Sequence, residues 1–242
     1  MAVEDGKYSP VLSVRSGYLS ARFNLTDKAQ DMPETPSGNF NKPVEVDADE
    51  LRRALDTLWV SVSTETTRYY LNGIFFHQNE GTAALRLVST DGRRLTRVDM
   101  PEVPWEAIGC IVHTKAIKQL RQHLKGAGKV TVSTEKDGKI FRVEAPSWTL
   151  TTKPVDGKYP NYARVIPQVD ATFDTSLSGD AIAAMMVKGR NAPIALHMNP
   201  DEGRMWVFNP EMGEVSLPLT GTGGLCGANL KYLRDFCPRG EA

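Results

Sequence analysis

The chain alternates between two spacings of apolar residues, one of two positions and one of three to four. The first spacing predicts strands, and the second predicts amphipathic helices. Between residues 44 and 62 a short predicted strand leads into a helix that begins near Asp47, an aspartate placed three residues before Glu50 as a helix cap. The apolar face of this helix is predicted to carry Leu51, Ala54, Leu55 and Leu58.

Strand-like runs follow that helix, and the turn-forming residues Asn79, Gly81 and Asp91 separate them. These predicted strands span residues 69–77, 83–89 and 95–100. The same order of strand, helix and strands then returns as a second repeat, with a hairpin turn at Asp137-Gly138. Its predicted strands span 108–112, 129–133, 140–144 and 148–153, and its helix spans 114–124 with Ile117, Leu120 and Leu124 buried.

Two further repeats follow with weaker patterns. The third is predicted over residues 172–220, with a short helix at 179–187 and strands around 195–198, 205–208 and 214–219. The fourth begins at Leu225 and contains a helix at 228–236. At the other end of the chain, residues 11–15 and 18–25 alternate as strands and no helix is predicted beside them.

A helix without its strands and a set of strands without its helix cannot each bury an apolar face alone. We therefore expect the two ends of the chain to complete one split domain together. The predicted organisation is an N-terminal strand segment at residues 1–42, an intact central domain at 43–168 and a partial C-terminal domain at 169–242. Helices and mostly consecutive strands in this order predict an α+β fold.

Three stretches of the central region carry a family pattern. They read RYYLNG at residues 68–73, STDGRRL at 89–95 and KPVDGKYPNYARVIP at 153–167. In order and separation, these stretches resemble the central domain of the beta subunit of bacterial DNA polymerase III, the sliding clamp. A weaker resemblance links residues 225–236 to the last domain of that family and residues 11–36 to its first.

The resemblance implies a DNA-clamp fold, in which helices line a central hole and sheets form the outer wall. It also implies a function, that of a processivity factor that encircles duplex DNA without reading its sequence and tethers polymerase and clamp loader through short peptide motifs. The family ring has six domains, and four repeats in this chain make two, so we expect a homo-oligomer of three chains.

Charge changes this picture in one respect. Lysine and arginine balance aspartate and glutamate at 29 each, so the whole chain lacks the basic excess of a general nucleic-acid binder. A DNA interface must then depend on where the cations lie, and the predicted helices place them opposite their apolar faces. The expected DNA-binding residues are Arg52, Arg53, Lys115, Lys118, Arg121, Gln122, Lys231 and Arg234.

The resemblance also implies a hydrophobic pocket for partner peptides between the central and last domains. Arg93 stands where the family usually has a histidine. A role in the buried core is the alternative for Leu71 and Leu95. The positions that match the family's pocket are Leu71, Thr90, Gly92, Arg93, Leu95 and Pro167.

No constellation of catalytic residues is predicted. Asp91 and Asp156 each precede a glycine, as tight turns require, and the four histidines are scattered without a partner at nucleophile or metal-ligand spacing. The three cysteines include no C-x-x-C pair and are read as reduced and structural. We therefore expect a protein that is not an enzyme and needs neither metal nor cofactor.

Two other functions remain open at this point. A monomeric clamp-derived protein that competes for clamp partners would need the pocket alone, whereas basic helices favour the ring. An enzyme acting on DNA is the weaker alternative, because no paired carboxylates or metal ligands are recognised. The sequence shows neither a signal peptide pattern nor an apolar run long enough for a membrane span, so a cytoplasmic location without membrane contact is expected.

Overall fold

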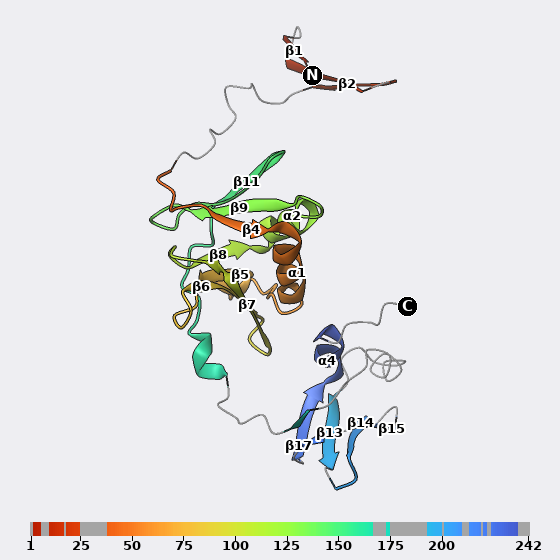
Figure 1. Cartoon of the computed structure of the whole chain (residues 1–242). Coiled ribbons are helices and arrows are strands. Elements are labelled where there is room, and N and C mark those ends of the chain that lie inside the picture. Colours follow the sequence, from red (N-terminus) through yellow and green to blue (C-terminus); the bar gives the residue numbers. More distant parts are fainter. Residues whose placement is uncertain are drawn as a thin grey trace. The chain divides into compact units, whose positions relative to one another are not determined.

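The computed structural model describes residues 2–5, 10–16, 18–24, 38–166, 173–174, 193–199, 201–209, 213–218, 220–221 and 224–236. The chain divides into two compact units, Met1–Gly38 and Asn39–Ala242, and each is considered by itself (Figure 1). Among the described residues, no helix has the length and apolar character needed to cross a membrane.

The smaller unit contains one antiparallel sheet of three strands in the order β1, β2, β3. Its strands are β1 (Ala2–Asp5), β2 (Pro10–Ser16) and β3 (Leu19–Asn24). The last two match strands predicted from alternation, whereas β1 was missed because four residues are too few to establish a period. The predicted packing of these strands on the C-terminal helix stays a prediction.

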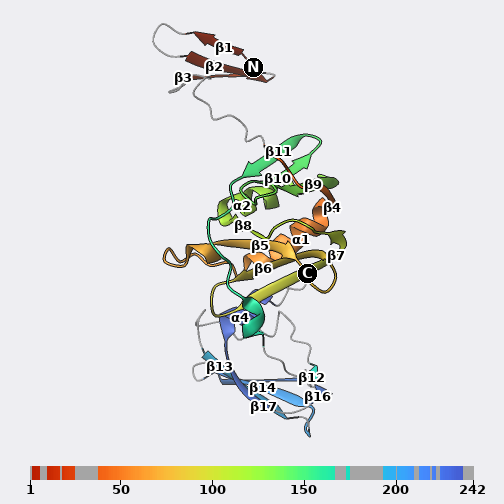
Figure 2. The same ribbon diagram turned by 90° about the vertical axis from the view of Figure 1, so that its left-hand side faces the viewer.

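The larger unit begins with the two predicted repeats of the central region, and both fold in the predicted order (Figures 1 and 2). The first repeat consists of β4 (Val44–Asp47), α1 (Ala48–Trp59), β5 (Gly73–Gln78), β6 (Ala84–Thr90) and β7 (Leu95–Pro104). The second consists of β8 (Cys110–His113), α2 (Thr114–His123), β9 (Lys129–Thr134), β10 (Phe141–Ala145) and β11 (Trp148–Thr152).

The two repeats exchange their first strands. One sheet has the order β11-β10-β9-β4 and the other β7-β6-β5-β8, so β4 and β8 each complete the sheet of the other repeat. The helix starts are tied in the same crossed way: the Ala48 amide donates to the Gly128 carbonyl at 2.8 Å, and the Thr114 amide donates to the Asn72 carbonyl at 3.1 Å. The repeats therefore form one interlocked domain with internal two-fold similarity.

The core of this domain lies between α1, α2 and the two sheets. All four predicted apolar residues of α1 are buried, as are Ile117, Leu120 and Leu124 in the second repeat. Phe76 and Phe141, one from each sheet, meet at the centre with ring centroids 5.0 Å apart. Burial of each such side chain contributes about 1.5–3 kcal/mol. The cap prediction is confirmed too, because the Glu50 amide donates to Asp47 Oδ1 at 2.8 Å.

One predicted strand began too early. Residues 69–71 form a 3₁₀ helix, η2 (Tyr69–Leu71), closed by a hydrogen bond from the Leu71 amide to the Arg68 carbonyl at 2.9 Å. The strand begins at Gly73, where an added Cβ would lie 2.5 Å from the Val112 carbonyl oxygen of the neighbouring strand. Tyr69 and Leu71 follow the two-residue spacing of a strand, so the sequence pattern did not distinguish the turn from a strand. Gly73 was the signal that could have located the start of the strand.

The rest of the larger unit contains a four-stranded antiparallel sheet in the order β15-β14-β13-β17. It is formed by β13 (Pro193–Asn199), β14 (Arg204–Asn209), β15 (Gly213–Pro218) and β17 (Gly224–Asn229), and β12 (Phe173–Asp174) pairs with β16 (Thr220–Gly221) separately. Helix α4 (Leu230–Phe236) starts two residues later than predicted, because Asn229 Oδ1 accepts from the Lys231 amide and caps it there. The helix predicted at 179–187 lies outside the described residues.

Candidate functional site

A hollow of about 380 Å³ lies beside the turn between β6 and β7, and we call it the turn pocket. It brings together five of the six residues predicted for a peptide pocket, and the sixth, Pro167, lies outside the described residues. Those five are Leu71, Thr90, Gly92, Arg93 and Leu95. The prediction missed the other lining residues, which are Arg68, Tyr70, Arg94, Pro160, Asn161, Tyr162 and Val165.

The floor of the turn pocket is a tightly bonded loop. Asp91 Oδ1 accepts from the Arg93 and Arg94 amides at 3.0 and 3.1 Å, and Thr90 Oγ1 accepts from the Gly92 amide at 3.0 Å. Gly92 has a φ of 85°, which a residue with a side chain rarely adopts. These bonds make Asp91 a structural turn residue, as the sequence indicated, and they hold the pocket floor in one shape.

Arg94 joins this loop to helix α4. Its guanidinium forms ion pairs with Asp91 at 3.0 Å and with Asp235 at 2.7 Å, and it lies 4.7 Å from the centre of the Tyr232 ring. Burial lowers the pKa of Arg94, but the hydrogen bonds to Asp235 and Asp91 outweigh it and the pKa is raised above its ordinary value. The Arg94 side chain is only 12% exposed, and its ion pairs hold it in one position at the pocket edge.

Stacked rings support the opposite side of the pocket. Tyr162, in the 3₁₀ helix η3 (Tyr162–Val165), is hydrogen-bonded through its hydroxyl to His77 Nε2 at 3.0 Å. His77 stacks on Phe75, and Phe75 stacks on Tyr159, with centroids 4.6 and 4.7 Å apart. Burial is the main reason that the pKa of His77 is lowered. His77 is therefore a packing residue behind the pocket wall.

Leu71 and Val165 differ in how they line the pocket. Leu71 is only 3% exposed and belongs to a buried cluster with Val88, Ile111 and Tyr159. Val165 is 71% exposed at the rim. The alternative that Leu71 belongs to the core thus has a structural basis. Leu71 lies beneath the pocket and offers little surface for a ligand to contact.

Replacement of Leu71 by alanine is therefore expected to act on stability. We expect a loss of about 2–4 kcal/mol in the free energy of unfolding, because a buried leucine leaves a cavity. Urea denaturation followed by circular dichroism measures it. Val165→Ala, at the exposed rim, is the matched control and should change stability by less than about 0.5 kcal/mol. Equal losses in the two variants would contradict the assignment of Leu71 to the core.

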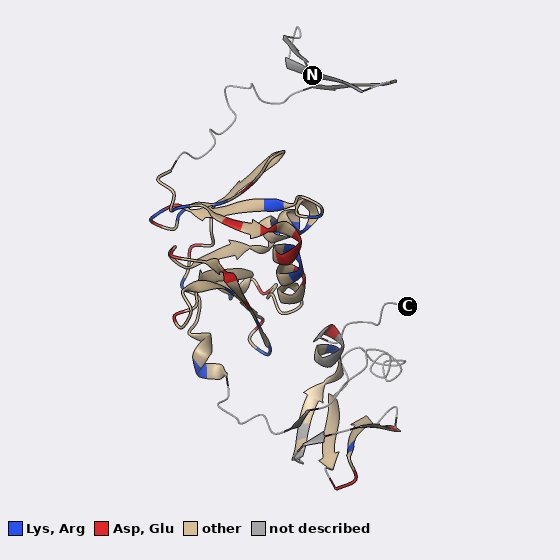
Figure 3. Ribbon diagram, viewed as in Figure 1, with Lys and Arg blue, Asp and Glu red and all other residues tan. Residues whose placement is uncertain are grey.

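The predicted DNA-binding residues of α1 and α2 fall into two groups. Arg52 pairs with Asp49 and Asp56 on its own helix, at 3.5 and 3.0 Å. Arg121 pairs with Asp56 at 2.6 Å and lies over the Trp59 ring, 4.7 Å from its centre. Acidic and basic residues thus alternate along α1 (Figure 3). The charge of these two arginines is largely compensated locally.

The second group is open to solvent. Arg53, Lys115, Lys118 and Gln122 are exposed, and within the described part of the chain the three cations among them form no ion pair. Lys115 and Lys118 also line a shallow hollow of about 430 Å³ between α2 and the residues after α1. In α4, Lys231 is half-buried, and the side chain of Arg234 lies outside the described residues. Two of the three exposed, unpaired cations predicted for DNA binding in the described residues, Lys115 and Lys118, therefore lie on α2.

The potential metal ligands and the cysteines were also located in the structure. Among the described residues, no three histidine, cysteine or carboxylate side chains are grouped to hold a metal ion. Cys110 is a free, buried thiol, and burial raises its pKa to about 12, so it stays protonated. Cys237 lies outside the described residues, and so does the side chain of Cys226.

Comparison with known proteins places the central domain in one family. The model for the central domain of the DNA polymerase III beta subunit matches residues 45–161. The beta sliding clamp of Caulobacter vibrioides is 36% identical over 243 aligned residues, which cover 94% of this chain and 64% of that protein. The chain thus spans less than two thirds of the length of this relative.

Solved structures give the same result. A crystal structure of the DNA polymerase sliding clamp from Caulobacter crescentus matches with a TM-score of 0.74 and 31% identity, covering 95% of this chain and 67% of that one. The sliding clamp from Bartonella birtlesii bound to griselimycin matches with a TM-score of 0.77 and 30% identity, covering 93% and 63%. The likeness extends beyond the central domain to nearly the whole described chain.

Proposed function

Because this chain belongs to the DNA polymerase III beta-subunit family, the sliding clamps, we propose that it is a non-enzymatic processivity factor that encircles duplex DNA. The observation that carries the proposal is the turn pocket, where residues from three separate stretches of the family pattern meet in one hollow. Partner proteins, such as a polymerase or a clamp loader, would bind there while the ring stays on DNA.

Helix α2 would supply the main attraction for the phosphate backbone. Lys115, Lys118 and Gln122 are exposed on its polar face, opposite the buried Ile117 and Leu120. Long, exposed lysines attract phosphates through water without fixing a register, so the energy changes little as the protein moves along DNA. Direct hydrogen bonds to base edges would instead favour particular sequences and oppose sliding.

Arg52 and Arg121 would have a different role. The Arg121–Asp56 ion pair joins α2 to α1 across the surface and keeps the two helices in register, whereas the Arg52–Asp56 pair lies within α1. The charges of both arginines are half-buried and already compensated, which leaves little counterion release on DNA binding. We therefore assign the larger electrostatic contribution to Arg53, Lys115 and Lys118.

Ring closure would come from several copies of the chain. A ring built only from the 242-residue chain, with two clamp-type domains per copy, would need three copies to reach six domains. In this arrangement the N-terminal strands and the C-terminal residues 169–242 form a composite domain, within one copy or between neighbours. The sheet edges at β7 and β11, which pair with no further strand among the described residues, are suited to joining adjacent domains.

Replacement of both Lys115 and Lys118 by alanine should weaken DNA association and flatten its dependence on salt. Each lost phosphate contact should reduce the slope of log K against log salt by about 0.9, so the pair should reduce it by up to about 2. Fluorescence anisotropy with a labelled duplex at several salt concentrations measures the slope. The matched control replaces Lys136 and Lys153, which are exposed in loops between strands, and should leave the slope unchanged. An equal change in both variants would show that α2 has no special role.

A further inference from the structure

The two faces of the sheet β15-β14-β13-β17 differ in burial. Successive residues of a strand point to opposite faces. On β14, Met205 and Val207 are each 1% exposed, whereas Phe208 is 48% exposed. Leu225 on β17 pairs with His197, a neighbour of Phe208 on the same face, and Leu225 is 74% exposed. Large apolar side chains that share an exposed face are typical of an interaction surface.

A hollow of about 230 Å³ lies on this exposed face, and we call it the aromatic hollow. His197 on β13 pairs with Trp206 on β14. Phe208 pairs with Ala195 on one side and with Glu214 on the other. The small Ala195 side chain leaves room between the larger rings beside it. The strand register thus brings together the residues that line the hollow, which are Ala195, His197, Trp206, Phe208 and Glu214.

Glu214 gives the aromatic hollow an unpaired carboxylate. It is exposed and forms no ion pair within the described part of the chain, and no described lysine or arginine lines the hollow. Arg204, also on β14, is hydrogen-bonded to the Ser216 hydroxyl and does not line the hollow. The turn between β13 and β14 adds the exposed carboxylates of Asp201 and Glu202 to this sheet. The surroundings of the hollow therefore favour a cation.

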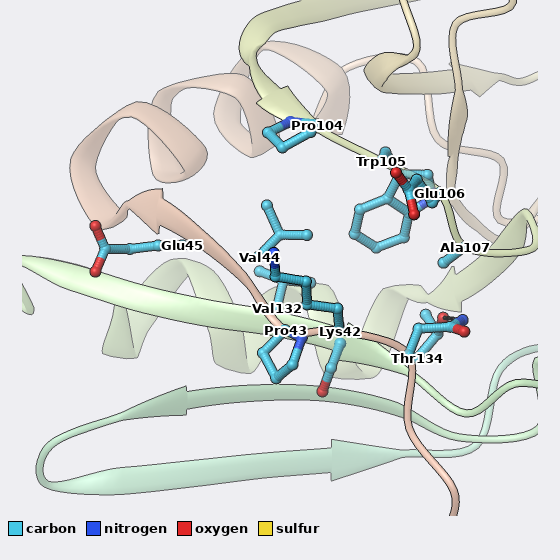
Figure 4. Close-up of a pocket in the computed structure, with 12 residues that line it drawn as sticks. Lys42, Pro43, Val44, Glu45, Pro104, Trp105, Glu106, Ala107, Val132 and Thr134 are labelled. Carbon is cyan, nitrogen blue, oxygen red and sulfur yellow. Dashed lines mark hydrogen bonds between the residues drawn. The ribbon is translucent and has the colours of Figure 1, made fainter.

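The hollow beside β4 differs in both its ring and its carboxylate. It has a volume of about 420 Å³, and the chain's own loop after β7 forms one side of it (Figure 4). Its aromatic lining residue, Trp105, is 1% exposed and offers a ligand no ring face. The Glu45 carboxylate points away from Trp105 and pairs with Lys129. An exposed ring beside an unpaired carboxylate therefore distinguishes the aromatic hollow.

A guanidinium group matches both properties of the aromatic hollow. This flat cation is attracted to the faces of aromatic rings, most strongly to tryptophan, and it pairs with carboxylates. An uncharged apolar ligand would instead remove Glu214 from water without giving it a partner. A phosphate group would be repelled by the carboxylates of Glu214, Asp201 and Glu202. The hollow is thus better suited to a basic protein segment than to nucleic acid.

We propose that the aromatic hollow binds an arginine side chain from a basic segment of a partner protein. The guanidinium would lie against the rings of Trp206 and Phe208 and pair with Glu214, all of which line the hollow. An aliphatic residue next to the arginine would pack on the exposed Leu225, which pairs with His197 at the side of the hollow. The rings would supply apolar contact, and Glu214 would select for positive charge.

The probe is an acetylated and amidated peptide with the sequence GLRLG, titrated into the full chain. We expect a saturable shift of the Trp206 indole proton in the nuclear magnetic resonance spectrum, assigned with Trp206→Phe. A peptide with citrulline in place of arginine keeps the shape without the charge and should bind at least about fivefold more weakly. Glu214→Gln should weaken binding of the arginine peptide about two- to fivefold, the range of an exposed ion pair.

Glu102→Gln is the matched control, because Glu102 is an exposed carboxylate on β7 that does not line the aromatic hollow. It should leave probe binding unchanged. Absence of probe binding to the wild-type chain would overturn the proposal, and so would equal binding of the citrulline peptide or equal losses in the two glutamine variants. A lower mass in solution for Glu214→Gln than for the wild type would also overturn it, because another copy of this chain would then be the occupant. None of these results depends on whether the protein encircles DNA.

Discussion

On nicked circular duplex DNA the protein should remain bound through extended washing at moderate salt, and it should be lost once the same DNA is cut to a linear form. A ring is held by topology, so its loss requires either a free DNA end or ring opening, whereas surface binding depends only on the contacts at each site. A bead-linked plasmid, with the protein detected after restriction cleavage, measures the retained fraction. We expect near-complete loss after cleavage.

The control for this experiment blocks both ends of the linear DNA with bulky protein. Retention should then return, because a ring cannot pass the blocks, although the DNA is still linear. Light scattering should give a mass of a closed oligomer rather than that of the 26.7 kDa chain. Equal retention on circular and linear DNA together with a monomeric mass would favour a clamp-derived binding protein that does not encircle DNA.

Val165→Asp should abolish binding of a short hydrophobic clamp-binding peptide to the turn pocket. The side chain lies at the exposed rim, so the substitution places a charge where the peptide must bury an apolar group, and this opposes binding by a few kcal/mol. A loss of about 3 kcal/mol corresponds to more than a hundredfold in affinity and would remove micromolar binding from the measurable range. Isothermal titration calorimetry measures the affinity.

Val165→Thr is the matched control, because it keeps the shape of the side chain and adds no charge. It should retain binding within about tenfold, since one polar substitution at an exposed rim costs little. Thermal melting should be the same for both variants and the wild type. Normal peptide binding by a folded Val165→Asp protein would place the partner site elsewhere on the chain.

The sequence predicted the helices of the central domain best, because burial alone decides their pattern. Leu51, Leu55 and Leu58 are spaced for one face, and all three are fully buried in the structure. The 3₁₀ turn at Tyr69–Leu71 escaped prediction because its apolar residues alternate as in a strand, although local turn bonds hold them. Alternation reports burial of a face and does not by itself report the backbone conformation.

The candidate site was predicted in part for a related reason. The resemblance to the family located Thr90, Gly92 and Leu95. Position in the sequence did not reveal that Arg94 would be held between Asp91 and Asp235, which lies 141 residues after Arg94. It likewise did not reveal that Asp56 pairs with Arg121, 65 residues further along the chain. Ion pairs between distant segments depend on the finished fold, and no local period records them.

The exchange of β4 and β8 between the repeats bears on how the central domain folds. Neither repeat can complete its sheet until the other has been synthesised and has returned its first strand, so each half taken alone keeps an unpaired edge on β9 or β5. Early folding intermediates should therefore be sparse, and the two halves should gain protection from hydrogen exchange together. A ribosome-bound chain that ends at residue 107 should not yet form a stable fold. The domain should become protease-resistant only after β11 has emerged from the ribosome.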